Sequence, residues 1–308
     1  MILTVLVFFV GVGLLYVGAE GLVRGSIAIA QGLRIRPIVI GLTVVAFGTS
    51  APEFIVSLIS AFAGSSDIAL GNVVGSNIAN IGLILGIAAL IYPVDIESQS
   101  ITIYYPVLLL SSIILYLFAL NEIIGFVDGL FLMGGIVVFT IFLIKRTEKV
   151  YHDDSTTVTK EPVRGLQVLF VIAGIVFLVI GSHLMVESGV TIARSFGISE
   201  FIIGATLIAV GTSLPELAAT IVAVMKKNTG IIIGNIIGSN IFNVLFVAGG
   251  VSLLHPLSVD TASLRFEFPV MIAFSVVLLI MMKTGFLINR IEGILLLLGY
   301  IVFLAFLF

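Results

Sequence analysis

Two glutamates lie in the middle of long apolar runs of this 308-residue sequence. Glu53 is near the centre of the run 37–62, and Glu216 is near the centre of the run 200–225. A carboxylate at that depth in a membrane is costly and persists only where a partner or a cavity compensates it. No Lys or Arg is expected at the same depth, so the partner is either a proton or a mobile cation. Paired carboxylates suit one hard divalent ion such as calcium.

The residues before each glutamate predict a break in the helix. Pro52 and Pro215 cannot donate the helical hydrogen bond, and Gly48 and Gly211 loosen the preceding turn. Backbone carbonyls freed near residues 46–49 and 209–212 would point into the site. They would be joined there by nearby hydroxyl groups, those of Thr49, Ser50, Thr212 and Ser213. Such oxygens are suitable ligands for sodium and calcium, and unwound backbone at this depth is tolerated only where it is buried or lines a cavity.

The same segments also admit a purely structural interpretation. SAPE at 50–53 and SLPE at 213–216 both match a capping box, with Pro at the first helical position and Glu reaching back to the cap. A cap and a ligand are compatible roles. A capping box normally marks a helix end in water, whereas these two lie at mid-membrane, which favours the ligand role.

A second polar pattern lies in the next apolar run of each half. Polar residues recur there at a spacing of four, which places them on one helix face: Asn72, Ser76 and Asn80 in the first half, and Asn235, Ser239 and Asn243 in the second. Asn80 and Asn243 are the deepest and are expected to face the glutamates. The alternative is interhelical packing beside small-xxx-small glycine pairs. It carries more weight for Asn72 and Asn235 than for the other four.

The elements that must position these residues are membrane helices. The chain is 60% hydrophobic and only 10% charged, whereas soluble domains carry about 25% charged residues. Continuous apolar runs of this length fit helices that cross about 30 Å of hydrocarbon and do not fit a β-barrel. The expected spans are residues 2–19, 37–62, 68–91, 101–120, 124–144, 166–186, 200–225, 230–254, 266–283 and 289–307. Polar residues near their ends, such as Glu20 and His183, are expected to be interfacial.

The chain repeats itself at one offset. Residues 39–53 and 202–216 share nine of fifteen residues, and residues 68–80 and 231–243 share eight of thirteen, both at an offset of 163. Five helices per half is an odd number, so the second copy must be inverted. The predicted fold is therefore an all-α integral membrane protein of ten transmembrane helices in two inverted five-helix repeats, 1–145 and 166–308, joined by the linker 146–165. In many secondary transporters such repeats place the substrate at the bilayer midplane, between interrupted helices.

The distribution of basic residues predicts the orientation. With the N-terminus outside, twelve of the 14 Lys and Arg residues fall in inside loops and only Arg194 and Arg265 fall outside. This bias places both termini outside the cell and the hydrophilic loop 146–165 in the cytoplasm of a multi-pass cell-membrane protein.

The two motif pairs resemble the signature repeats of the calcium/cation antiporter superfamily and, within it, the sodium/calcium exchanger branch. The matching segments are GTSAPE at 48–53 and GNVVGSNIAN at 71–80, with GTSLPE at 211–216 and GNIIGSNIFN at 234–243. Prokaryotic members of the branch have this size. The resemblance implies a calcium site of Glu53, Glu216 and the carbonyls of Thr49 and Thr212.

The resemblance also implies sodium sites that use the same two glutamates. The further sodium ligands would be Ala46, Ser50 and Ser76 on one side and Ala209, Ser213 and Ser239 on the other. Asn80 and Asn243 would flank the centre. Some members carry an aspartate at the position of Asn243, so coupling ratio and potassium dependence stay open. The implied mechanism is alternating access, in which the first and sixth helices slide past the rest. Their glycines, including Gly11, Gly13, Gly18 and Gly181, would suit that sliding contact.

Other functions are less consistent with the sequence. A proton/calcium exchanger, or another cation/calcium antiporter, could use the same glutamate pair. A passive channel would need a continuous polar path, and an intramembrane hydrolase would need a nucleophile and base or a metal set. Neither HExxH nor a phosphate loop occurs. The prediction is thus a transporter and not an enzyme, without cofactor, nucleic acid or obligatory protein partner, acting on calcium and sodium ions in a lipid bilayer.

Overall fold

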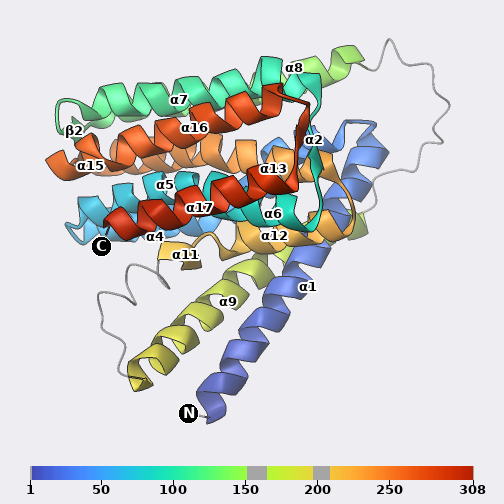
Figure 1. Cartoon of the computed structure of the whole chain (residues 1–308), viewed down its shortest axis with the longest axis horizontal. Coiled ribbons are helices and arrows are strands. Elements are labelled where there is room, and N and C mark those ends of the chain that lie inside the picture. Colours follow the sequence, from blue (N-terminus) through green and yellow to red (C-terminus); the bar gives the residue numbers. More distant parts are fainter. Residues whose placement is uncertain (1, 151–164, 197–208, 308) are drawn as a thin grey trace.

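The computed structural model describes residues 2–150, 165–196 and 209–307, and nearly all of them are helical (Figure 1). Eight of the described helices are long and apolar enough to cross a membrane, and a bent pair makes a ninth. The prediction of an all-helical membrane protein is confirmed. The tenth expected span, 200–225, begins among residues that lie outside the described ones, and its described part is α11 (Ala209–Gly211) and α12 (Leu214–Met225).

The spans are built from α-helices and short π-helical turns. In the first half they are α1 (Ile2–Leu33), then α2 (Pro37–Ile40), η1 (Gly41–Val45), α3 (Ala46–Thr49) and α4 (Ala51–Phe62), then α5 (Ser66–Ala79), η2 (Asn80–Leu85) and α6 (Gly86–Ile91), then η3 (Ser100–Tyr104) and α7 (Tyr105–Ala119), and α8 (Phe126–Val150). In the second half they are α9 (Gly165–Ser195), α11 and α12, then α13 (Thr229–Phe242), η5 (Asn243–Ala248) and α14 (Gly249–Leu254), then α15 (Thr261–Arg265) and α16 (Glu267–Lys283), and α17 (Arg290–Leu307).

Equivalent elements of the two halves begin 163 residues apart. This holds for α4 and α12, for α5 and α13, and for the π-helical turns η2 and η5, which start at Asn80 and Asn243. The sequence repeat is therefore also a repeat of local structure, including the π-helical turn, which is a rare element that often marks functional sites.

Two small antiparallel ladders, which the sequence did not predict, join the halves at their ends. Strand β1 (Val94–Asp95) pairs with β4 (Leu287–Ile288), and β2 (Ile123–Ile124) pairs with β3 (Leu257–Ser258). Each ladder has only two residues per strand, which is too short to produce an alternating hydrophobic pattern.

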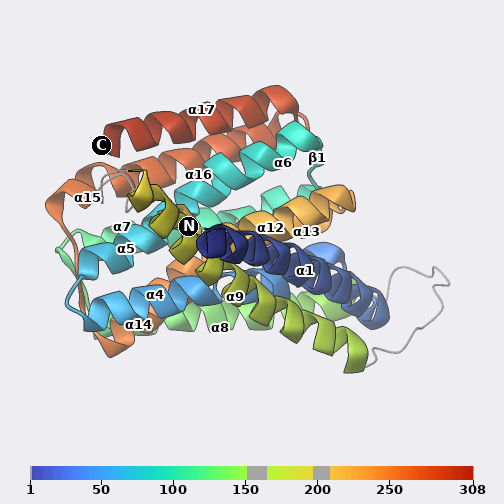
Figure 2. The same cartoon turned by 90° about the horizontal axis from the view of Figure 1, so that it is seen from below.

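The interior is formed by the helices that carry the repeated motifs. The most apolar part of the span containing α13 is 94% buried, and that of the span containing α5 is 72% buried, whereas α1 and α17 are each 22% buried. Seen from below, α17 lies at one edge and α8 at the other, with α5 and α13 between them (Figure 2). The Asn and Ser residues of the repeated motifs in α5 and α13 are therefore held away from the lipid-facing surface.

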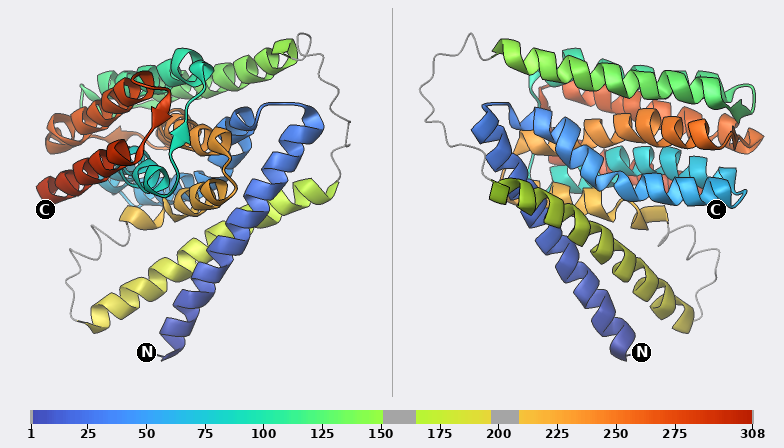
Figure 3. Two further views of the ribbon diagram at one scale, coloured as in Figure 1. Left: turned by 45° about the vertical axis from the view of Figure 1, so that its right-hand side comes forward. Right: turned by 180° about the vertical axis from the view of Figure 1, so that it is seen from behind.

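The helices α1 and α9 cross the rest of the bundle diagonally and project from it (Figure 3). They are longer than the predicted spans 2–19 and 166–186, because they continue through the charged residues at which the apolar runs end. Glu20 and His183 therefore lie inside these helices and not at their ends, which corrects the prediction. At 1.5 Å per residue, the 32 residues of α1 span about 48 Å, more than the hydrocarbon thickness.

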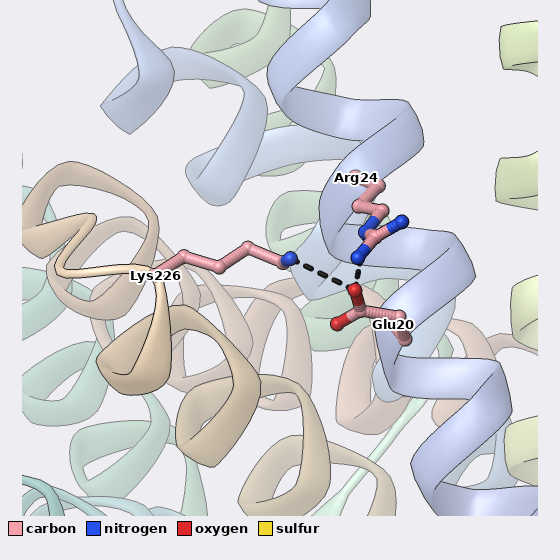
Figure 4. Close-up of polar contacts among 3 residues, drawn as sticks. All are labelled: Glu20, Arg24 and Lys226. Atoms are coloured by element: carbon pink, nitrogen blue, oxygen red, sulfur yellow. Dashed lines mark hydrogen bonds and ion pairs between the residues drawn. The ribbon is translucent and has the colours of Figure 1, made fainter.

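Ion pairs explain how α1 continues through its charges. Glu20 pairs with Arg24 one turn later, and its Oε1 also accepts from Nζ of Lys226, at the end of α12, at 2.9 Å (Figure 4). Pairs at this helical spacing stabilise a helix. In α9, Nε2 of His183 and Oε1 of Glu187 lie 3.3 Å apart at the same helical spacing. The Lys226 contact fastens α1 to α12.

Glycines join α1 to α9. A Cβ on Gly18 would lie 2.7 Å from the backbone nitrogen of Leu178, and one on Gly11 would lie 2.9 Å from the carbonyl of Gly181. Gly13, in contrast, has nothing within 4 Å. We expected these glycines to face the rest of the protein and to suit sliding against it, and that expectation is wrong. Gly11, Gly18 and Gly181 lie between α1 and α9 and permit the close contact of these two helices.

The predicted linker 146–165 is described only at its two ends. Helix α8 continues to Val150, so the first residues of the predicted linker 146–165 are helical, and α9 already begins at Gly165. Residues such as Lys145 and Arg146 are good helix formers, so the helix outlasts its apolar run. The remainder of the predicted linker lies outside the described residues.

Candidate functional site

Both glutamates follow a break in their helices. Helices α3 and α4 meet at Ser50 with a bend of 41° between the segments Pro37–Thr49 and Ala51–Phe62. In the second half, α11 ends at Gly211 and α12 begins at Leu214. Pro52 and Pro215 each lie within the first two residues of the following helix, where the missing N–H costs nothing. The glutamate after each proline is therefore in the first turn of its helix.

The two carboxylates are fully buried. Glu53 and Glu216 are each 0% exposed. Neither oxygen of Glu53 has a hydrogen-bond partner among the described residues, and the same is true of Oε2 of Glu216. No described Lys, Arg or His forms an ion pair with either side chain. A buried carboxylate without a partner is strongly destabilised unless a proton or a cation compensates it.

Among the described residues, hydroxyl groups donate to one oxygen of Glu216 and to neither oxygen of Glu53. Ser50 donates to Oε1 of Glu216 at 3.1 Å, and Ser239 donates to the same oxygen at 3.5 Å. Ser213, which is the repeat equivalent of Ser50, instead donates to Oγ of Ser76 at 3.2 Å. The two halves of the site are therefore not in the same arrangement.

The capping-box interpretation is contradicted. Ser50 and Ser213 occupy the N-cap positions of α4 and α12, but neither side chain makes a capping hydrogen bond. Their hydroxyls bond across the site, Ser50 to the carboxylate of the other half and Ser213 to Ser76. The serines therefore contribute to the polar centre and not to the helix ends.

The expectation of freed carbonyls is only partly met. The carbonyl of Ala46 accepts from the Ser50 N–H at 2.9 Å and lies 3.3 Å from Thr49 Oγ1, so it is already bonded. The carbonyl of Gly211 cannot bond to Pro215, and Ser182 of α9 donates to it at 2.7 Å. Because the break is short, neighbouring donors reach these carbonyls.

The asparagines meet at the junction of the two halves. Asn80 Nδ2 donates to Oδ1 of Asn240 at 3.0 Å, and Asn77 Nδ2 lies 3.4 Å from the carbonyl of Asn240. Oδ1 of Asn80 and both polar atoms of the Asn243 side chain are buried without a described partner. Asn77 and Asn240 were missed in the sequence, although both belong to the repeated GSN segment. The four-residue spacing drew attention to their neighbours instead.

The remaining predicted ligands lie along the same centre. Thr49 Oγ1 is 3.4 Å from Ser239 Oγ, and both residues are fully buried. Thr212 is partly buried and donates to Asn72 at 2.9 Å. Ala46 is fully buried, and Ala209 is the first residue of α11.

This arrangement is suited to holding a cation with oxygen ligands. It combines two buried carboxylates with hydroxyl and amide oxygens at the meeting point of the two halves. No group of three or more His, Cys, Asp and Glu side chains is found within residues 2–150, 165–196 and 209–307, so the formal charge comes from the glutamates. Few charges and many neutral oxygens favour weak binding of sodium or calcium, as release requires.

Comparison with known proteins gives full-length matches. The family model described as "Sodium/calcium exchanger protein" matches residues 3–145 and 166–308. The chain is 35% identical over 342 residues to the sodium/calcium exchanger MaX1 of Methanosarcina acetivorans, with 98% of each chain covered. It is also 35% identical over 317 residues to the inner membrane protein YrbG of Escherichia coli, with 100% of this chain and 98% of that protein covered.

Solved structures agree with the sequence matches. A structure of the sodium-calcium exchanger NCX_Mj has a TM-score of 0.87 at 32% identity, covering 99% of this chain and 98% of that one. The similarity extends over the whole fold and is not confined to the two motif pairs.

Proposed function

Because this chain belongs to the sodium/calcium exchanger family, we propose that it exchanges sodium for calcium across the membrane. The family and the fold show a multi-pass membrane protein that is a cation/calcium antiporter. Glu53 and Glu216 are the shared ligands. The resemblance stated for the sequence is confirmed at the level of the family. The observation that carries the proposal is the pair of fully buried carboxylates, three of whose four oxygens lack a described partner.

The proposed ligand set follows the polar centre. Calcium takes the carboxylates together with the carbonyls of Thr49 and Thr212. Sodium ions use the same carboxylates with further neutral oxygens, which come from Ala46, Ser50, Ser76, Ala209, Ser213 and Ser239, while Asn80 and Asn243 flank the centre. Because the two ions compete for the same oxygens, the site must release one before it binds the other.

The proposed architecture is two inverted five-helix repeats, residues 1–145 and 166–308, which make ten spans with the site between them. Equivalent helices at an offset of 163 support the repeat. Both termini are proposed to be extracellular and loop 146–165 cytoplasmic, from the distribution of Lys and Arg. In this arrangement the end of α12 at Lys226, where Glu20 holds α1, is on the cytoplasmic side.

The test is calcium-45 uptake into proteoliposomes preloaded with sodium, potassium or protons alone. We expect uptake that requires an outward sodium gradient and is lost in Glu53→Gln and in Glu216→Gln. Glu187→Gln is the matched control, because the side chain of Glu187 is 66% exposed and its partner among the described residues is His183. Uptake driven by protons alone would assign the protein to proton/calcium exchange. Uptake that survives both substitutions would refute the glutamate pair.

A further inference from the structure

Two asparagines outside the proposed ligand set bond to both halves of the site. Asn72 in α5 donates through Nδ2 to the backbone carbonyl of Glu53 at 3.1 Å and to Ser57 Oγ at 2.9 Å. Its Oδ1 accepts from Thr212 Oγ1 of the other half at 2.9 Å. One side chain therefore connects the glutamate of its own repeat with the threonine of the other.

Asn235 in α13 makes the same contacts with the two halves exchanged. Its Nδ2 lies 3.4 Å from the backbone carbonyl of Glu216 and 3.1 Å from Thr220 Oγ1. Its Oδ1 accepts from Thr49 Oγ1 at 3.3 Å. The pattern thus occurs at equivalent positions of both repeats, and each asparagine bonds to both halves.

We propose that Asn72 and Asn235 are positioning residues of the cation site, each fixing the glutamate of its own repeat against the threonine of the opposite repeat. The inference rests on the proposed function and deepens it, because it names residues that set cation affinity without touching the cation. The contacts that Asn72 and Asn235 make between helices would then serve to position the ligands of the site.

The contacts themselves determine the orientation of each amide. In Asn72 the nitrogen has two acceptors, Glu53 O and Ser57 Oγ, and the oxygen has one donor, the hydroxyl of Thr212. A flipped amide would place Oδ1 against the backbone carbonyl of Glu53, acceptor against acceptor, so only one orientation satisfies all three bonds. Packing alone would need only a small side chain between α4 and α5, not a side chain with three directed bonds.

We call each asparagine, together with the glutamate carbonyl and the threonine hydroxyl that it bonds, a clamp. The clamp also fixes the position of the threonine. The Thr212 hydroxyl donates to Asn72, and this bond fixes the residue whose backbone carbonyl is the proposed calcium ligand. A shift of Asn72 would move this carbonyl relative to Glu53, whose backbone the same amide holds. Small displacements matter because cation ligands must sit within a narrow range of distances.

The two clamps are unequal. Thr49 Oγ1 has three neighbours at similar distances, namely Asn235 Oδ1 and Ala46 O at 3.3 Å and Ser239 Oγ at 3.4 Å. Its single proton can serve only one of them at a time. The bond from Thr212 to Asn72 is shorter, at 2.9 Å. Loss of Asn72 is therefore expected to disturb the site more than loss of Asn235.

The test compares Asn72→Leu, Asn235→Leu and Thr212→Val in two assays on the full-length protein. One is sodium-driven calcium-45 uptake into proteoliposomes, and the other is equilibrium dialysis of purified protein with calcium-45. For Asn72→Leu we expect the half-saturating calcium concentration and the dissociation constant to rise about tenfold, equivalent to about 1.4 kcal/mol. The maximal rate per folded molecule should change less, and Asn235→Leu should have a smaller effect.

A double-mutant cycle separates positioning from general stability. If Asn72 acts through Thr212, the variant carrying both Asn72→Leu and Thr212→Val should bind calcium about as weakly as the weaker single variant. Thr212→Ser keeps the hydroxyl donor and should recover most of the affinity that Thr212→Val loses. Thr140→Val is the matched control, because the hydroxyl of Thr140, within the part of the chain that the structure describes, bonds inside α8 to the carbonyl of Ile136.

Several outcomes would overturn the proposal. A lower yield of folded protein at unchanged calcium affinity would mean that Asn72 only stabilises the fold. Additive effects of Asn72→Leu and Thr212→Val would mean that the two residues act separately. If the wild-type protein binds calcium but shows no sodium-driven uptake, sodium/calcium exchange is refuted. The calcium dissociation constants of the wild type and of Asn72→Leu, measured by dialysis, would still test the positioning role of Asn72. Unchanged binding in Asn72→Leu would refute the clamp and leave the exchange intact.

Discussion

Replacing Gly18 by alanine is expected to force α1 away from α9. A Cβ at this position would lie 2.7 Å from the backbone nitrogen of Leu178 and 2.8 Å from the carbonyl of Gly174. Both atoms belong to the backbone of a regular helix and cannot rotate away. Ordinary contact begins near 3.4 Å, so the helices must separate by about 0.7 Å at this point.

The free-energy change can be bounded from the same geometry. Overpacking a tight contact costs about 1–3 kcal/mol. Gly→Ala within a helix also contributes about 1 kcal/mol of stabilisation through helix propensity, which partly offsets that cost. Gly13→Ala on the same helix is the matched control, because Gly13 is exposed and a Cβ there meets nothing within 4 Å. The propensity gain is common to both variants, so their stabilities should differ by about 1–3 kcal/mol.

Thermal unfolding followed by circular dichroism is the suitable assay, since the chain has neither Trp nor Cys for intrinsic tryptophan fluorescence or thiol-reactive dyes. We expect Gly18→Ala to unfold several degrees below Gly13→Ala. Equal unfolding temperatures would show that the contact between α1 and α9 is looser than described. The conclusion that these glycines join the two helices would then be refuted.

Two further substitutions test other parts of the structure. Asn243→Asp should lower the calcium dissociation constant about tenfold, because it adds a third carboxylate where both amide atoms lack a described partner. Equilibrium dialysis measures the dissociation constant, and Asn121→Asp, at an exposed turn, is the control. An unchanged calcium affinity in Asn243→Asp would contradict the prediction. Lys226→Met should lower stability by about 1 kcal/mol, because it removes the partly buried contact with Glu20. Thermal unfolding measures this second effect against the exposed control Lys283→Met, and no difference between the two variants would contradict it.

Much of the fold followed from the sequence because membrane helices must satisfy their own backbone hydrogen bonds and must be apolar. The repeat at an offset of 163 also predicted where equivalent helices begin, and Glu53 and Glu216 are buried as their depth in the apolar runs required. Helix lengths were harder to predict. Helix α1 continues through Glu20 because that charge meets Arg24 and Lys226, and the second partner is distant in sequence.

The sequence predicted which residues form the polar centre but not which of them bond to each other. The motifs located Ser50 and Ser213, yet nothing in the sequence distinguishes their partners, since both precede the same Pro-Glu pair by the same spacing. Asn77 and Asn240 were missed for a similar reason: their partners lie on other helices, so no local spacing marks them. Partner choice depends on how the halves are placed against each other.

The differences between equivalent residues carry mechanistic content. In the proposed architecture, two inverted repeats in identical arrangements would expose the site equally to both sides, which the proposed alternating-access mechanism must avoid. Ser50 donates to Glu216, whereas its equivalent Ser213 donates to Ser76, so that the Glu53 carboxylate has no donor among the described residues. Exchange of the two repeat conformations would therefore turn Ser213 toward Glu53 and Ser50 toward Ser239. Disulfide cross-linking can capture the state in which the two repeats have exchanged conformations. Because the chain has no cysteine, designed cysteine pairs can be introduced without removing native thiols. A structure of that state with Ser213 still bonded to Ser76 would contradict the exchange.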